Sequence, residues 1–420
     1  MKRFWKISLG LGAAGVASVI ATTYVGAQSD SGREQIPGAV IEISAKALAK
    51  PYATPSRANA SNDIPRGNNM PIVPAGFRVN VFAENLSHAR NLFVAENGDI
   101  LLAEQRPGKV TLLRDADGDG VAETVQPFAE GFSTVYGLAA SKDTLFVADT
   151  QGIWRIPYTA GDSKARAAQT RITEGGAFGS NGGHVTRTLA LAPDGAKIYV
   201  AVGSRGNIAE EEEQRATIQE FTLEGGKAVN RRTFASGLRN PVGTAFYPAT
   251  NSLYTVVNER DGLGDELVPD YLTQVSEGGF YGWPYSYIGA NPQQGYAEKR
   301  TDLVKKAIVP DVLFRSHSAP LGLAFYTGSS FPAEYQGGAF VALHGSWNAA
   351  KPRAYHVVFV PFKGGKPAAN SYKVFASGFW TGTDNPQVWG RPASVAVAKD
   401  GSLLIADDGS QTVFRVSAVK

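Results

Sequence analysis

The chain repeats one pattern of apolar and polar positions. Each copy has a small or apolar start, a β-rich run, a turn, and a second apolar strand that often ends near an acidic residue. The copies are RNLFVAENGDILLAE, YGLAASKDTLFVAD, RTLALAPDGAKIYVAV, VGTAFYPATNSLYTVV, LGLAFY with GGAFVALHG, and ASVAVAKDGSLLIADD. Three of their turns read ENGD, PDG or KDG, and antiparallel hairpins prefer glycine-containing turns of this kind. The pattern therefore predicts six β-hairpins.

The spacing of these hairpins predicts how they assemble. Their starts lie 46 to 79 residues apart, at Asn91, Gly137, Thr188, Gly243, Gly322 and Ser394. This spacing suits four-stranded propeller blades with inserted loops. We therefore expect an all-β fold, a six-bladed β-propeller of four-stranded antiparallel blades, over residues 70–420. The ring should close by pairing the N-terminal strand GFRVNVFAENL with the C-terminal TVFRVS.

Composition agrees with this fold. The 420 residues include 47 glycines and 23 prolines, which favour tight turns and short strands over long helices. Only 19% of the residues are charged and the net charge is +3. No basic cluster carries interleaved aromatic residues, so the sequence gives no electrostatic footprint for nucleic acid.

The first residues predict export. Lys2, Arg3 and Lys6 precede an uncharged stretch that ends in Val25-Gly26-Ala27, a small-residue cleavage pattern. We expect residues 1–27 to be a signal peptide, although the stretch is also long enough for an uncleaved membrane anchor. The chain has no cysteine, so an exported form would carry no disulfides. A periplasmic or secreted location follows.

Residues 28–69 differ from the rest of the chain. They are rich in Ser, Ala, Pro and Asn and have weak periodicity. This composition indicates a linker or extended arm, with a short helix near residues 45–49.

Three loops beside the hairpins carry candidate chemistry. His184 stands directly behind two glycines, and an imidazole titrates near neutral pH. Arg239 and Asn240 place a guanidinium beside a carboxamide, which suits a planar ligand that bears carboxylates. The loop NERDGLGDEL collects carboxylates and free carbonyls, the oxygen ligands that calcium prefers. The alternatives are a structural histidine, an exposed arginine on a turn and a solvated acidic loop.

The aromatic run GGFYGWPYSYIG, residues 278–289, has two interpretations. Its flat rings could stack on a sugar or a cofactor, or they could pack between blades.

Together, HVTRTLALAPDG, GLRNPVGTAFYP, NERDGLGDEL, GGFYGWP, ALHGSWN and GRPASVAVAKDGSLLIAD resemble the soluble quinoprotein glucose/sorbosone dehydrogenase family. The resemblance covers most of residues 72–417 and is strongest toward the sorbosone dehydrogenase-like branch. It implies a six-bladed propeller that binds pyrroloquinoline quinone (PQQ) and calcium. It also implies oxidation of sugars, related alcohols or hydrated aldehydes.

The resemblance assigns roles residue by residue. His184 would be the general base that removes the proton of the substrate hydroxyl. Arg239 and Asn240 would contact the quinone, and Arg391 would hold one of its carboxylates. The calcium of the cofactor would lie at the loop that contains Glu259, Arg260, Asp261 and Gly262.

The chain departs from the family pattern at three places. Asp261-Gly262 stands where glucose-oxidising members have Gly-Pro, so calcium ligation here is expected to use a side chain. Ser204 stands where those members have an acidic residue after the third hairpin. Their cofactor-binding lysine has no clear match, and His344 lies nearby, with Lys351 and Arg353 further on.

Two acidic segments lie outside these motifs. Asp115, Asp117, Asp119 and Gly120 follow the start of a calcium-loop pattern, but the twelfth position is Gln126, which excludes an EF-hand. A structural calcium site and an acidic hairpin tip both remain open. The run EEEEQ, residues 210–214, is most simply a solvated charge run.

The leading interpretation is an exported PQQ- and calcium-dependent dehydrogenase. It would act on a small sugar, sugar-derived aldehyde or polyol and release electrons to an external acceptor, with no membrane contact beyond the export signal. One alternative is a calcium-dependent propeller hydrolase or lactonase, in which the metal polarises an ester carbonyl. Another is a binding module that kept the propeller without its chemistry.

Overall fold

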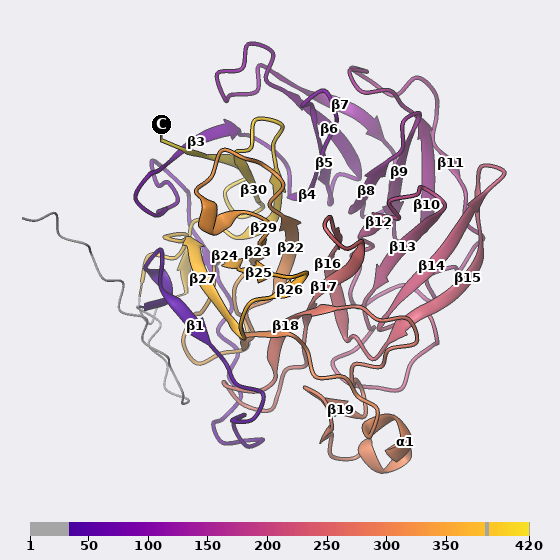
Figure 1. The fold of residues 1–420 in the computed structure, drawn as a ribbon, viewed down its shortest axis with the longest axis vertical. Helices are drawn as coiled ribbons and strands as arrows, with labels where there is room; N and C mark the ends of the chain where they lie inside the picture. The colour runs from indigo at the N-terminus through magenta and orange to yellow at the C-terminus, as the bar shows by residue number, and fades with distance from the viewer. Residues whose placement is uncertain (1–32, 383–385, 420) are drawn as a thin grey trace, which may run out of the picture.

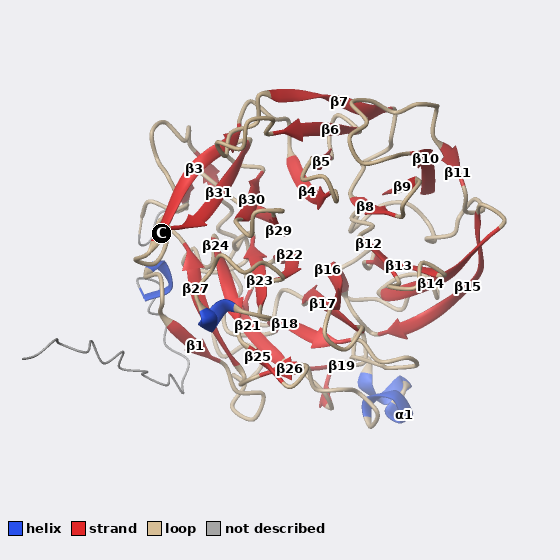
Figure 2. Cartoon of the chain, turned by 45° about the horizontal axis from the view of Figure 1, so that its top comes forward, coloured by secondary structure: helices blue, strands red, loops and turns tan. Residues whose placement is uncertain are grey.

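The computed structural model describes residues 33–382 and 386–419, so the predicted signal peptide lies outside the described residues. Six small antiparallel sheets form a ring, which confirms the predicted six-bladed β-propeller (Figure 1). Figure 2 shows that strands make up most of the regular secondary structure and that helical turns are few and short. None of the helices in the described ranges is long and apolar enough to cross a lipid bilayer.

The first three blades follow one another along the chain. They are β4 (Ala89–Val94), β5 (Ile100–Glu104), β6 (Lys109–Arg114) and β7 (Thr124–Glu130); β8 (Gly137–Ala140), β9 (Thr144–Asp149), β10 (Gly152–Pro157) and β11 (Thr170–Arg171); and β12 (Leu189–Leu191), β13 (Lys197–Val202), β14 (Thr217–Glu224) and β15 (Lys227–Ser236).

The next three blades complete the ring. They are β16 (Asn240–Tyr247), β17 (Ser252–Asn258), β18 (Pro269–Gln274) and β21 (Val312–Ser316); β22 (Pro320–Phe325), β23 (Ala339–Leu343), β24 (His356–Val360) and β27 (Ser371–Ala376); and β29 (Pro392–Val397), β30 (Leu403–Asp407), β31 (Thr412–Ala418) and β3 (Phe77–Ala83).

Short elements occupy the connections. They are η1 (Arg33–Gln35), β1 (Val40–Glu42), β2 (Asn62–Asp63), β19 (Ser286–Tyr287), β20 (Asn291–Pro292), η2 (Ala297–Lys299), α1 (Thr301–Val304), η3 (Ala333–Tyr335), β25 (Phe362–Lys363), β26 (Lys366–Pro367) and β28 (Gln387–Val388).

Each predicted hairpin forms the two inner strands of one blade. Ring closure also follows the prediction, because β3 from the start of the propeller sequence pairs with β31 from its end, with Phe77 opposite Ala418. The sixth blade therefore joins the two ends of the propeller sequence.

Glycines at the starts of the inner strands allow neighbouring blades to approach. A Cβ on Gly137 would lie 2.2 Å from the carbonyl oxygen of Arg187, and one on Gly322 would lie 2.7 Å from the Cα of Ser394. No side chain fits at these distances. The glycines at the starts of these two repeats are thus a packing requirement between neighbouring blades.

The axis is hollow at one level and closed at another. A cavity of about 130 Å³ is lined by the starts of the inner strands, including Asn91, Thr188, Gly243, Gly322 and Ser394. Four of the residues that directly precede the six hairpin starts are buried and apolar, and they pack together across the axis: Tyr136, Val242, Leu321 and Ala393. This apolar layer, here called the floor, separates the cavity from the loops that precede the inner strands.

Residues 33–69 pack against the propeller. Strand β1 adds a fifth strand to the blade of β22 by pairing with β27, and β2 pairs in parallel with β28. Residues 45–47 form a turn, so the short helix expected near residues 45–49 is wrong. Between β1 and β2, residues 52–59 form hydrogen bonds to loops at one end of the ring, such as Tyr52 N–H to the Leu263 carbonyl (2.8 Å). We call residues 52–59 the arm.

Candidate active site at one end of the propeller

The predicted site residues lie at the same end of the ring. His184, Arg239 and Arg391 stand just before or at the beginning of the inner strands β12, β16 and β29, whereas Glu259 and His344 directly follow the second strands β17 and β23. Because the first two strands of a blade are antiparallel, the beginning of one and the end of the next meet at one edge. This edge, above the floor, is called the site end.

His184 is oriented by a backbone group. Its Nδ1 lies 2.8 Å from the carbonyl oxygen of Ser204, and its own backbone N–H donates to the same oxygen (3.0 Å). A carbonyl oxygen only accepts hydrogen bonds, so Nδ1 carries the proton and Nε2 keeps its lone pair. Residue 203 must be glycine here, because a Cβ on Gly203 would lie 2.7 Å from the Cβ of His184.

The surroundings keep His184 neutral. Its pKa is lowered to about 4, chiefly by burial and next by the positive charge of Arg239, while the Ser204 carbonyl acts in the opposite direction. Near pH 7 the imidazole is therefore unprotonated at Nε2 and can accept a proton.

Arg239 is buried and is held by acceptors of the protein itself. Its Nη1 donates to the Glu259 carbonyl (2.7 Å), and its Nε and Nη2 donate to the carbonyl and side-chain oxygens of Asn207 (both 3.1 Å). The guanidinium thus ties together the loops after β13 and β17. The adjacent Asn240 is also buried, and its Oδ1 has no hydrogen-bond partner within the described residues.

The loop after β17 is held by hydrogen bonds within itself and to two neighbouring loops. The Asp261 carbonyl accepts from Arg260 Nη2 (2.8 Å) and from Asn207 Nδ2 (2.9 Å). The Gly262 N–H donates to Asn348 Oδ1 (3.3 Å). Glu259, the first residue of this loop, is buried, and burial raises its pKa to about 7.

His317 is a site residue that the sequence reasoning missed. Its Nδ1 lies 3.0 Å from the Asp261 carboxylate and its Nε2 lies 3.0 Å from the Gly264 carbonyl. The imidazole therefore holds two points of the loop after β17. The signal that selected His184, a histidine shortly before the first strand of a hairpin, also applies to His317.

A second group of charges surrounds His344. Its Nε2 lies 2.8 Å from Asp408 Oδ1, and Arg90 Nη1 lies 2.5 Å from the other oxygen of Asp408. Burial and the nearby Arg391 lower the pKa of His344. Burial alone would raise the pKa of Asp408, but His344 and Arg90 hold it well below its usual range. Sequence reasoning did not single out Arg90 or Asp408, which lie far apart along the chain.

The acidic run 210–214 shapes the site. Glu211 accepts hydrogen bonds from the backbone N–H groups of Arg205 and Gly206 (2.7 and 2.9 Å). Glu212 accepts from the N–H of Ser180 (2.7 Å). Glu210, Glu212 and Glu213 are exposed, as expected for a solvated charge run, but Glu211 and Glu212 also anchor the segments beside Ser204 and His184.

The aromatic run 278–289 contributes mainly to packing. Tyr281 and Trp283 are 0% and 4% exposed, and the Trp283 indole N–H donates to the Asn207 carbonyl (3.1 Å). This favours the packing interpretation for both rings.

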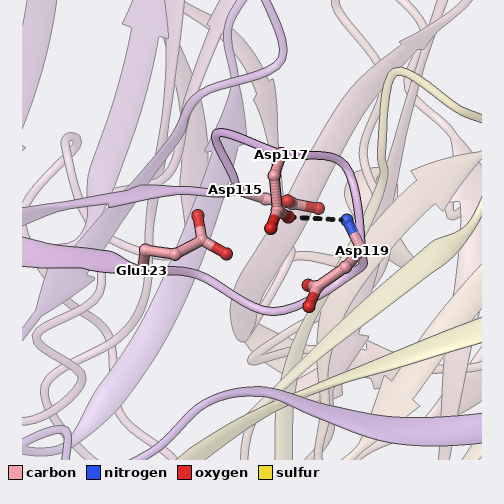
Figure 3. Close-up of side chains that lie close together, drawn as sticks. All are labelled: Asp115, Asp117, Asp119 and Glu123. Carbon is pink, nitrogen blue, oxygen red and sulfur yellow. Dashed lines mark hydrogen bonds between the residues drawn. The ribbon is translucent and has the colours of Figure 1, made fainter.

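The acidic turn 115–123 brings four carboxylates together (Figure 3). Asp115, Asp117, Asp119 and Glu123 each have an oxygen within 4.8 Å of the others. Glu123 was not among the residues singled out from the sequence. All four side chains also accept backbone N–H groups of the turn, as Asp115 does from Gly118 (2.7 Å). These hydrogen bonds account for the geometry of the turn, and we assign it no ligand.

The fold and the site end define a six-bladed propeller with buried charged and amide groups around one face of its axis. Comparison with known proteins then gives the family. The TrAA12-like family model matches residues 71–294 and 293–419, so the chain belongs to the TrAA12-like family. This agrees with the quinoprotein resemblance of the motifs, while the sorbosone dehydrogenase-like branch stays a prediction.

Two curated proteins share part of the amino-acid sequence of this chain. An uncharacterized protein of Borreliella burgdorferi is 32% identical over 235 residues, which cover 56% of this chain and 60% of that protein. A PQQ-dependent pyranose dehydrogenase of Coprinopsis cinerea is 25% identical over 401 residues, which cover 81% of this chain and 54% of the relative. The chain thus spans little more than half the length of these curated relatives.

Solved structures share the fold. The holo form of the PQQ domain of the Coprinopsis cinerea pyranose dehydrogenase superposes with a TM-score of 0.71 at 21% identity, covering 84% of this chain and 98% of that one. A calcium structure of a Trichoderma reesei Carbohydrate-Active Enzymes Family AA12 protein gives a TM-score of 0.70 at 18% identity, covering 86% and 100%.

Proposed function

We propose that this protein is an oxidoreductase that uses PQQ to oxidise a sugar, a sugar-derived aldehyde or a polyol. Membership of the TrAA12-like family and the PQQ-dependent pyranose dehydrogenase among the relatives support this class of reaction. The observation that carries the proposal is the orientation of His184, whose Nε2 keeps a lone pair at the site end because Nδ1 donates to Ser204.

The residues at the site end fit a flat, anionic quinone. Within the described residues the side chain of Arg391 donates one hydrogen bond, from Nε to the His344 carbonyl (3.4 Å), which leaves its terminal N–H groups for a carboxylate. The neighbouring Asn240 is buried, and its Oδ1 packs against Gly203 without a hydrogen-bond partner within the described residues. Arg239, whose N–H groups already bind protein oxygens, would act mainly through its positive charge.

Calcium fits the loop after β17 less well. The Asp261 carbonyl already accepts hydrogen bonds from Arg260 and Asn207, and the Asp261 carboxylate contacts His317. Glu259 is buried and its pKa is raised to about 7, so a large fraction of its carboxyl group is protonated at neutral pH. As placed, these oxygens do not form a cage for a hard cation. Calcium therefore takes no part in the steps proposed here.

PQQ, when bound, supplies an electrophilic carbonyl that accepts hydride, which no side chain can supply. His184 Nε2 accepts the proton of the substrate hydroxyl as the hydride leaves the substrate carbon. The Ser204 carbonyl keeps the other ring proton on Nδ1 and stabilises the imidazolium that forms. The proton then passes to solvent.

Finer features of the proposal follow from the sequence. We infer a sorbosone-type substrate, an external electron acceptor, and export to the periplasm or the medium by the signal in residues 1–27. These features rest on the motifs and on the N-terminal segment.

A visible absorbance spectrum of the purified protein with PQQ, recorded with and without calcium, tests the proposal. We expect PQQ to remain bound through gel filtration and its absorbance to change when an aldose or polyol is added. Free PQQ only, together with no reduction of an artificial dye, would contradict the proposal. Turnover of a lactone without PQQ would support the hydrolase alternative, and PQQ retention without turnover would support the binding module.

The variants His184→Ala and His184→Gln test the role of the imidazole. Both should lower turnover by about 10²- to 10⁴-fold, the usual contribution of a general base, while PQQ binding is retained. His184→Gln preserves most of the side-chain volume, so it controls for packing. Unchanged turnover in both variants would remove His184 from the reaction.

A further inference from the structure

Trp347 is exposed where the other described tryptophans are not. Its exposed fraction is 52%, whereas Trp283, Trp380 and Trp389 are 6% exposed or less and Trp154 is half-buried. A large aromatic side chain left in water gives up favourable burial free energy. Single exposed apolar residues are common on protein surfaces, so its position and support decide whether Trp347 has a function.

The loop that carries Trp347 is fixed on both sides. The preceding Ser346 is fully buried, and its carbonyl accepts the hydroxyl of Tyr355 (2.5 Å). The following Asn348 is 8% exposed and donates from Nδ2 to the Arg57 carbonyl in the arm (3.3 Å). The carbonyl of Trp347 itself accepts the N–H of Asn59 (2.7 Å). The exposed indole therefore projects from an ordered backbone.

This loop lies at the site end. It directly follows β23, and it begins with His344 of the charge group around Asp408. On its other side, Asn348 accepts the N–H of Gly262 from the loop after β17 (3.3 Å). Trp347 thus belongs to the segment that links the charge group around Asp408 to the loop after β17, and its side chain is exposed to solvent.

We infer that Trp347 is a stacking surface for the pyranose ring of the substrate. This inference rests on the proposed function and narrows its substrate class to cyclic sugars. One face of a pyranose ring is formed largely by C–H groups, while its hydroxyls point outward. A flat indole at the edge of a polar site matches that combination, because the apolar face contacts the ring and the hydroxyls remain with charged residues and water. The arm fixes this surface through Asn59 and Arg57.

Steady-state kinetics of Trp347→Ala and Trp347→Phe in the PQQ-loaded protein test the inference. With D-glucose, D-galactose and D-xylose, Trp347→Ala should raise KM about tenfold, and kcat should stay within about twofold, because stacking acts on binding. Trp347→Phe keeps an aromatic face and should give a smaller rise. Acyclic D-sorbitol presents no ring, so its KM should not change. Val125→Ala, at an exposed apolar residue on the outer strand β7, is the matched control.

A second measurement does not depend on PQQ. In the cofactor-free protein, titration with the same cyclic sugars should change the tryptophan fluorescence of the wild type and not that of Trp347→Phe. Circular dichroism spectra identical to the wild type exclude misfolding as the cause. An unchanged KM for the cyclic sugars in Trp347→Ala, in a protein that turns over, overturns the inference and leaves the proposed function intact. A sugar-dependent signal from Trp347 in a protein that never retains PQQ keeps the stacking surface and rejects the proposed function.

Discussion

The Nδ1 atom of His184 lies 2.8 Å from the backbone carbonyl oxygen of Ser204. Ser204 stands where the glucose-oxidising members of the resembled family have an acidic residue, and here the acceptor for Nδ1 is a backbone carbonyl. The Ser204 Oγ also lies 3.2 Å from Nδ1, but it donates its own proton to the Gly206 carbonyl (2.7 Å). Orientation of the imidazole therefore depends on the path of the backbone.

This relationship predicts opposite outcomes for two neighbouring substitutions. Ser204→Ala keeps the carbonyl and should retain activity within about threefold, since the loss of one neutral hydrogen bond changes little. Gly203→Ala places a Cβ 2.2 Å from Asn240 Oδ1, so the backbone must move. We expect a loss of at least about tenfold in kcat/KM and of about 1–3 kcal/mol in unfolding free energy. Sugar oxidation assays and urea denaturation measure both, and equal activities of the two variants would contradict this account.

The pH dependence of His184 follows from its low pKa. Because the pKa is about 4 in the folded protein and ~6.5 in an unfolded chain, the folded state binds fewer protons between these values. The contribution of His184 to stability is thus present above about pH 6.5 and is lost as the pH falls toward 4. Proton NMR of the cofactor-free protein, assigned by comparison with His184→Gln, should give a midpoint near pH 4. A midpoint near 6.5 would show that the imidazole is not desolvated as described.

An anionic ligand should move this midpoint upward. Arg239 is the second cause of the low pKa, and carboxylates bound beside it would offset its charge. Repeating the titration with PQQ bound checks this expectation.

The fold was predictable from the sequence because its signals are local. A turn such as PDG and the apolar runs beside it lie within one hairpin, and the strands at the two ends of the repeat series were left to pair with each other, as Phe77 and Ala418 do. The same locality explains why His184 and Arg391 were found. Each stands just before a hairpin, where loops on a rigid scaffold meet.

The site residues that the sequence did not predict are brought together by contacts between segments that lie far apart along the chain. Asp408 meets His344 across 64 residues, and the acceptor for His184 is a carbonyl, which every residue possesses. No spacing rule identifies such partners. The support from Glu211 was also hidden, because a run of glutamates is usually solvated and only the folded chain brings its carboxylate to the N–H groups of residues 205 and 206.

Asp407, at the end of β30, is a buried carboxylate whose ionised form is disfavoured. We therefore predict that a neutral side chain at this position stabilises the protein. One oxygen accepts the N–H and the hydroxyl of Ser410 (2.6 and 2.9 Å), whereas the other is buried and, within the described residues, meets the backbone N–H of Arg391 only outside good hydrogen-bond geometry. Burial raises its pKa to about 7. The folded state therefore binds more protons than the unfolded state between about pH 4 and 7, and this group makes stability decline as the pH rises through that window. Asp407→Asn removes the charge and should add about 2 kcal/mol at pH 8 and little at pH 4.

Asp149 provides the control, because it occupies the corresponding end of β9. Its oxygens accept the N–H groups of Ser133 (2.8 Å), Gln151 (2.8 Å) and Gly152 (3.1 Å). An asparagine would turn an N–H group toward one of these donors, so Asp149→Asn should lower the unfolding free energy by about 1–3 kcal/mol at both pH values. Guanidinium denaturation at pH 4 and 8 measures both variants. A destabilised Asp407→Asn at pH 8 would mean that its carboxylate is stabilised by a contact beyond Ser410.

Phe77 on β3 tests how the ring is closed. Its ring lies edge-on to Phe331 and Phe375, with centroids 4.7 and 5.2 Å apart, and so fastens the N-terminal strand of the sixth blade to the core shared with the fifth. Phe77→Ala should lower the unfolding free energy by about 2–4 kcal/mol, since it removes both the buried area and these ring contacts. Arg78→Ala, on the exposed side of the same strand, should lower it by about 0.5 kcal/mol. Denaturant unfolding followed by tryptophan fluorescence compares them. Because β3 is the strand that joins the two ends of the propeller sequence, equal effects of the two substitutions would mean that closure does not depend on this apolar contact.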